Sequence, residues 1–139
     1  MNTIIELYSE ASAGNVDAAE FLTGWHIYCH LIDDIVDGDT PFTNERFLEV
    51  LMLANKVYSL PFYRTYAPML SSVVAMVTNT YADSVEWEKS DEEYKRKVAD
   101  VIRQCGNEMI YAVANICGGH TLMRKISLRL REAAYLDQH

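Results

Sequence analysis

Apolar residues recur three and four positions apart along almost the whole chain, and this helical period restricts the fold more than any other feature. No stretch of useful length alternates apolar and polar residues, so β-strands are not expected. Short connecting segments rich in Gly, Pro, Ser and Asp separate the apolar segments. The sequence therefore predicts an all-α bundle of five or six helices, formed by one domain over residues 1–139.

Capping residues mark the first predicted helices. Asn15 or Asp17 can cap the second helix, which stops at Gly38, and Thr43 can cap the third. Pro68 suits the first turn of a long fourth helix. The predicted ranges are about 3–13, 16–36, 44–58, 68–88, 91–118 and 121–136.

The fifth predicted helix has the clearest internal pattern. Ser90 and Glu93 form an S-x-x-E capping box at its start, and Gly118 and Gly119 end it. Its apolar residues have helical spacing and define an expected core stripe. These residues are Tyr94, Val98, Val101, Ile102, Cys105, Met109, Ala112, Val113 and Ile116. A basic amphipathic tail helix follows.

The negative charge is concentrated in the first part of the chain. Residues 1–60 hold ten acidic and two basic side chains, whereas residues 61–139 hold ten of each, which gives the net charge of −8. Such a balance argues against a nucleic-acid partner, because phosphate binding needs clustered Lys and Arg. An acidic field of this kind serves either a bound cation or the solubility of the surface.

The chain has no apolar run long enough to span a membrane, and its first residues lack the basic start of a signal peptide. Cys29, Cys105 and Cys117 are widely spaced, and no C-x-x-C pair occurs. These features predict reduced thiols and a cytoplasmic location.

An ionisable stripe runs along the otherwise apolar second helix. At 100° per residue, an arc of about 100° contains the stripe. Its members are His26, His30, Asp33, Asp34 and Asp37. Because most of the remaining circumference is apolar, we expect the helix to be surrounded by its neighbours and the carboxylates to lie in a partly dry place.

Three carboxylates that lie so near one another need their negative charge to be compensated. Raised pKa values, arginine partners or a divalent cation could each provide it. Since arginine is scarce nearby in the sequence, Asp33, Asp34 and Asp37 are predicted ligands of Mg²⁺ or Mn²⁺. The alternative is that Asp33 and Asp34 face water, while Asp37 only closes the helix. His30 is a candidate for proton transfer, although an inward histidine is often a core residue.

The fourth helix offers a second wall for such a site. Asn79 and Asp83, with Glu86 in the same series, share a face and could complete the metal shell. The adjacent series Thr80, Ser84, Glu88 has similar spacing, so the choice of face stays open. A helix that simply emerges into water is the plain alternative.

The fifth helix also carries polar residues. Asp100, Arg103 and Asn107 are expected to lie on the surface, and Gly106 could allow a close approach of helices.

The segment "YCHLIDDIVDG" (residues 28–38) resembles the first aspartate-rich motif of the squalene/phytoene synthases, within the class I isoprenoid synthase superfamily. The resemblance implies an all-α fold whose inward acidic motifs bind Mg²⁺, and Mg²⁺ that grips the diphosphate of a prenyl substrate. It carries the ligand role to Asp33, Asp34 and Asp37. An apolar cavity beneath the acids, lined by residues such as Trp25, Phe62, Met69 and Met76, would distinguish a protein of this kind.

Three functions are compatible with these features. The first is a small Mg²⁺-dependent all-α enzyme acting on a diphosphate- or triphosphate-containing small molecule, as a transferase, lyase or pyrophosphohydrolase. The second is a minimal or vestigial isoprenoid synthase-like domain. The third is a non-catalytic helical module that forms homo-oligomers or binds a partner.

Overall fold

The computed structural model describes residues 4–138, and within that range the chain forms helices and no strand. This confirms the all-α prediction; Thr3, the expected start of the first helix, lies outside the described residues. The α-helices are α1 (Ile4–Ala11), α2 (Val16–Val36), α3 (Asn44–Tyr58), α4 (Pro61–Trp87), α5 (Glu93–Ile102) and α6 (Asn107–Gln138). A 3₁₀ helix, η1 (Arg103–Gly106), joins α5 to α6.

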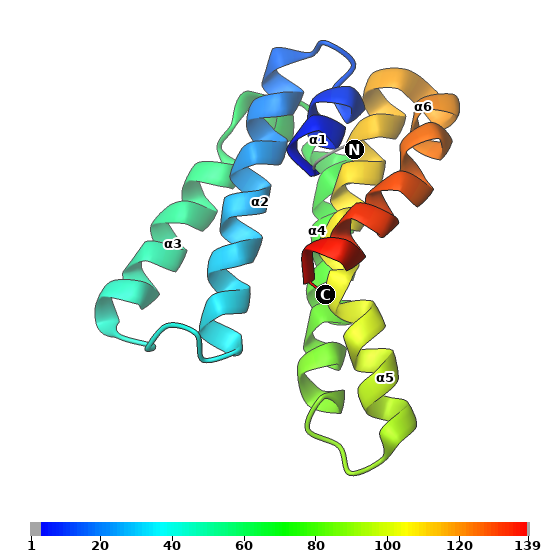
Figure 1. The fold of residues 1–139 in the computed structure, drawn as a ribbon. Coiled ribbons are helices and arrows are strands. Elements are labelled where there is room, and N and C mark those ends of the chain that lie inside the picture. Colours follow the sequence, from blue (N-terminus) through cyan, green and yellow to red (C-terminus); the bar gives the residue numbers. More distant parts are fainter. Residues whose placement is uncertain (1–3, 139) are drawn as a thin grey trace.

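The core lies where α1, α2, α4 and α6 meet, in the upper part of Figure 1. Its fully buried large side chains come from all four of these helices and include Leu7, Phe21, Leu70, Met109 and Ile126. Below the core, the α2–α3 hairpin and the α4–α5 hairpin diverge (Figure 1).

Two of the predicted caps are present. The side chain of Asn15 accepts a hydrogen bond from the Ala18 amide at 3.0 Å. Thr43 accepts one from the Arg46 amide at 3.2 Å. Gly38 follows α2 with a φ of +76°, a conformation that glycine adopts without steric cost.

The fourth helix extends further toward the N-terminus than predicted. It begins at Pro61 and is kinked at Tyr66, so Pro68 lies in the first turn after the kink. Pro61 is favourable at the first position because its missing N–H would have no helical partner there. Pro68 lies inside the helix, where its ring disturbs the preceding turn, and Tyr66 accordingly departs from helical geometry (φ −109°, ψ 19°).

The fifth predicted helix is divided in two. The capping box does not form: Glu92 is the N-cap of α5, and the Ser90 hydroxyl accepts a hydrogen bond from the Glu92 amide at 3.1 Å. Tyr94 and Val101 of the expected core stripe are exposed, whereas the part from Cys105 onward includes core residues such as Met109. The 3₁₀ turn resets the helical phase, so a single stripe cannot continue across it.

Within α6 the chain reverses direction at the predicted glycines (Figure 1). Gly119 has φ +76° and ψ −175°, which side-chain-bearing residues rarely adopt, and a Cβ on Gly118 would collide with Leu122. We call the part of α6 after Gly119 the returning arm. It packs on the part before Gly119, where the Tyr111 hydroxyl donates a hydrogen bond to the Ser127 carbonyl at 3.3 Å.

The returning arm is also held to α1. Arg129 makes two hydrogen bonds of 2.9 Å to the Glu10 carboxylate, and Lys125 lies 3.7 Å from it. Part of the basic charge of the tail is therefore used inside the chain. No helix in the described part of the chain is both long and apolar enough to cross a membrane.

Candidate functional site

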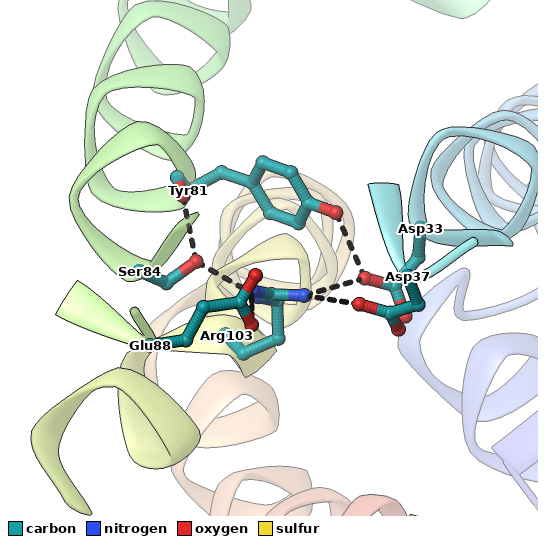
Figure 2. Close-up of polar contacts among 6 residues, drawn as sticks. All are labelled: Asp33, Asp37, Tyr81, Ser84, Glu88 and Arg103. Atoms are coloured by element: carbon teal, nitrogen blue, oxygen red, sulfur yellow. Dashed lines mark hydrogen bonds and ion pairs between the residues drawn. The ribbon is translucent and has the colours of Figure 1, made fainter. Parts of the chain in front are cut away.

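Arg103 lies at the centre of a polar cluster between α2, α4 and η1 (Figure 2). Its Nη1 donates to Asp33 Oδ1 at 3.2 Å and to Asp37 Oδ1 at 2.9 Å. On the α4 side, its Nε donates to the Ser84 hydroxyl at 2.8 Å, and its Nη2 pairs with Glu88. We call the six residues drawn in Figure 2 the Arg103 cluster; they are Asp33, Asp37, Tyr81, Ser84, Glu88 and Arg103.

Tyr81 completes this cluster from α4. Its hydroxyl donates to Asp33 Oδ1 at 2.8 Å, and the guanidinium of Arg103 lies 5.0 Å from the centre of its ring. Burial, followed by the hydrogen bond to Asp33, raises the pKa of Tyr81, so the hydroxyl stays protonated and acts as a donor.

The structure corrects the expectation that Arg103 is a surface residue. Its side chain is only 11% exposed, and it binds two of the three aspartates of the stripe. Of the three forms of compensation, the structure shows an arginine partner, and for Asp37 also a raised pKa. Burial and the neighbouring Asp33 nevertheless raise the pKa of Asp37, so Arg103 offsets the cost of that charge only in part.

The Arg103 cluster leaves several carboxylate oxygens available. Four of the five N–H donors of Arg103 are used, while Asp33 and Asp37 each bind it through one oxygen. Asp34 is exposed, and its carboxylate has no hydrogen-bond or ion-pair partner among the described residues. Within the described part of the chain, no three His, Cys, Asp or Glu side chains are arranged to hold a metal ion.

A cleft of about 510 Å³ opens beside the Arg103 cluster, within the range of small-molecule sites. Its polar lining residues include His30, Asp33, Asp34 and Arg103, whereas Asp37 is not among the residues that line it. Aromatic and apolar side chains also line it, among them Trp25, Tyr28, Tyr58, Val77 and Ile110. We call this space the α2–α4 cleft.

Two histidines of the stripe lie in the same cleft. The rings of His26 and His30 are 4.3 Å apart, and the Tyr8 hydroxyl is 2.8 Å from His26 Nδ1. Burial, then the positive charge of His30, lowers the pKa of His26. His26 is therefore held neutral by its surroundings, while His30 is exposed.

Asn79 and Asp83 are not brought to the aspartates of α2. Both are exposed, as is Glu86, and none of the three lines the α2–α4 cleft. Asn79 lies about 200° around α4 from Tyr81, which fixes it on the far side of the helix. Of the alternative series, Ser84 and Glu88 bind Arg103.

The apolar cavity expected from the resemblance is matched only in part. Trp25 lines the α2–α4 cleft and donates its indole N–H to the Gly106 carbonyl at 3.0 Å. Phe62 is buried in the core and Met69 is exposed. Met76 lines a different cleft of about 620 Å³, between α4, α5 and α6.

The cysteines do not form a nucleophilic site. Burial raises the pKa of Cys29 to about 12 and that of Cys105 to about 11. At neutral pH both thiols are protonated and therefore weak nucleophiles.

Comparison of the chain with protein-family models, with curated proteins and with solved structures gives no match.

Proposed function

We propose that the α2–α4 cleft binds a phosphorylated small molecule together with Mg²⁺ or Mn²⁺. The observation that carries this proposal is that Asp33 points across the cleft toward α4 while Asp34, next to it, is an acid without a partner in the described part of the chain. Two adjacent carboxylates at the mouth of a cleft of small-molecule size are a suitable place for a hard cation.

The residues fit a cation that arrives with its ligand. Mg²⁺ commonly keeps several waters and uses one or two carboxylates plus substrate phosphates, so a complete cage of protein ligands is not needed. Asp34 and the unshared oxygen of Asp33, the two aspartates that line the cleft, would hold the ion together with water and phosphate oxygens, and Asp37 would stay on Arg103. When bound, Mg²⁺ neutralises phosphate charge and stabilises a departing diphosphate. Asn79 and Asp83 have no place in this arrangement and remain untested as ligands.

The shape of the cleft favours a diphosphate that carries an apolar group. The phosphate end belongs near His30 and Asp34, and the aromatic wall formed by Trp25, Tyr28 and Tyr58 can cover an apolar tail. This agrees with the resemblance of residues 28–38 to the isoprenoid synthases. The reaction class is transfer, elimination or hydrolysis at a diphosphate bond, with His30 as the group that moves a proton.

Arg103 has a positioning role in this proposal. With four donors engaged, its guanidinium is not free to grip a phosphate. It holds Asp33 and Asp37 in place and reduces their mutual repulsion, which leaves Asp34 as the carboxylate most accessible to a cation.

Thermal unfolding with Mg²⁺, with inorganic pyrophosphate and with both together tests the proposal. A ligand that binds only the folded state raises the midpoint, so we expect the largest rise with both present. Asp34→Ala should abolish the rise, whereas Asp39→Ala, which removes another exposed acid just beyond α2, should retain it. An unchanged midpoint in the wild-type protein under all conditions would refute a metal-diphosphate site.

A second candidate is the non-catalytic helical module. One observation favours it: α3 presents large apolar side chains to solvent, and the buried residue of this helix is Val57. Such faces mark association surfaces more often than catalytic ones.

A further inference from the structure

We propose that two copies of this chain associate through α3, with the two helices antiparallel. The surface is a stripe of four exposed side chains, Phe47, Leu48, Leu51 and Met52, which we call the α3 stripe. This proposal does not depend on ligand binding in the α2–α4 cleft.

The α3 stripe is continuous and central on its helix. At 100° per residue its members lie within an arc of about 140°, a width typical of a face that packs against another helix. Phe42, also exposed, extends it, with its ring 6.1 Å from that of Phe47. The opposite side of α3 holds Leu53 and Val57 against the core, so the stripe is not needed for packing within the chain.

The charges beside the stripe favour a second copy as the occupant. Glu45 and Lys56 lie on the same edge, just beyond Met52, at about 100° and 120° from the start of α3. Both are exposed, and neither has an ion-pair partner among the residues described. They are eleven residues apart, about 16 Å along the helix. Glu49 lies on the same edge but is already paired with Arg46 at 2.8 Å. The two unpaired charges, one acid and one base at the two ends, therefore make the surface complementary to itself.

Antiparallel packing uses this complementarity. When two helices pack antiparallel about a two-fold axis, equivalent edges face each other, as in an isologous dimer. Glu45 of each copy then lies opposite Lys56 of the other. A parallel pair would instead place this edge against the apolar edge that contains Ala54, and both charges would stay unpaired. The α3 dipoles also oppose favourably in the antiparallel arrangement.

Sedimentation equilibrium of the full chain over a wide concentration range tests the proposal. One helix face is a small interface, so we expect a reversible dimer with a dissociation constant of about micromolar order. Leu51→Glu should weaken the dimer at least about 30-fold, because it buries a charge at the centre of the stripe. Leu128→Glu is the matched control and should leave the constant unchanged, since Leu128 is a similarly exposed leucine on α6 (68% against 51%).

A charge exchange tests the antiparallel arrangement. Glu45→Lys and Lys56→Glu should each weaken the dimer several-fold, and the two changes combined should restore it. Far-ultraviolet circular dichroism of every variant confirms that the helices persist. A wild-type chain that remains monomeric at the highest concentration, or a dimer that Leu128→Glu disrupts and Leu51→Glu does not, overturns the proposal. Failure of the combined exchange to restore affinity overturns the antiparallel arrangement.

Discussion

Arg103 Nη1 lies 3.2 Å from Asp33 Oδ1, although the two residues are 70 positions apart in the chain. This pair joins α2, in the first hairpin, to η1, the turn between α5 and α6 (Figure 2). A contact of this kind fixes the relative positions of the two hairpins. The geometry of the α2–α4 cleft therefore depends on it.

Replacement of Arg103 should destabilise the protein strongly. Arg103→Ala leaves Asp33 and Asp37 facing each other without a counter-charge, and removes the donor to Ser84. We expect a loss of about 2–4 kcal/mol in the free energy of unfolding, below the usual range for fully buried pairs because the carboxylates are partly exposed. Urea denaturation of the variant and the wild type provides the measurement.

Arg64→Ala is the control for this change. Arg64 is exposed on α4 and is not part of the cluster, so its loss should alter stability by less than about 0.5 kcal/mol. Arg103→Lys should not restore stability, because a single ammonium group cannot replace the several directed donors of the guanidinium. Equal effects of Arg103→Ala and Arg64→Ala would show that the cluster contributes nothing to stability.

The contribution of Asp37 to the free energy of unfolding should increase as the pH falls. Burial and Asp33 raise its pKa in the folded state above the ordinary value, so the folded protein binds this proton more tightly than the unfolded chain. Stability from Asp37 is thus fully present below about pH 3.8 and is lost as the pH rises through the raised pKa. Relative to Asp37→Asn, the wild type should gain stability as the pH falls from about 7 to about 4. Denaturant midpoints at a series of pH values give the difference, and a difference independent of pH contradicts the shift.

The fold was largely predictable because helical signals are local. Thr43 capped α3 as expected, and Gly38 ended α2, since each acts on the backbone next to it. The errors arose where two local signals competed. Pro61 and Pro68 can both begin a helix, and the structure uses both: α4 begins at Pro61, and a kink at Tyr66 precedes Pro68.

The part of the site formed by α2 could be predicted from the sequence, whereas the part formed by α4 could not. The stripe of α2 follows from residue spacing within one helix, and Asp33 does face α4. The choice between Asp83 and Ser84 depends on a rotation of α4 by about 100°, which the sequence of that helix alone leaves open. Arg103 was missed because its partners come from helices distant in the sequence. The one available signal was Gly106, three residues further along the chain, where the lack of a side chain allows close approach.

Gly119 should tolerate no side chain. Its φ of +76° with ψ near 180° belongs to a region that glycine alone adopts readily, and it sets the reversal of α6. Gly119→Ala should therefore cost about 1–3 kcal/mol in the free energy of unfolding. Gly106→Ala is the control, since a Cβ there would meet Cys29 Sγ at 3.5 Å, an ordinary contact. A thermal midpoint of Gly119→Ala equal to that of Gly106→Ala would contradict the role of this glycine.

His26 should make the folded protein sensitive to acid. Burial, then the charge of His30, lowers its pKa below 6.5, while Asp137 acts in the opposite direction. As the pH falls below about 6.5, the unfolded chain binds a proton at this position before the folded protein does, so stability decreases. We expect His26→Gln to lose less stability than the wild type between about pH 7 and about pH 5.

The comparison uses the slope of stability against pH, so a constant cost from the altered contact with Tyr8 cancels. His120→Gln removes an exposed histidine on α6 and should follow the wild-type slope. If His26→Gln also follows it, the proton balance at His26 does not differ between the folded and unfolded states. A smaller slope in His26→Gln alone assigns the acid sensitivity to this residue, and with it the neutral state of the imidazole beside Tyr8 and His30.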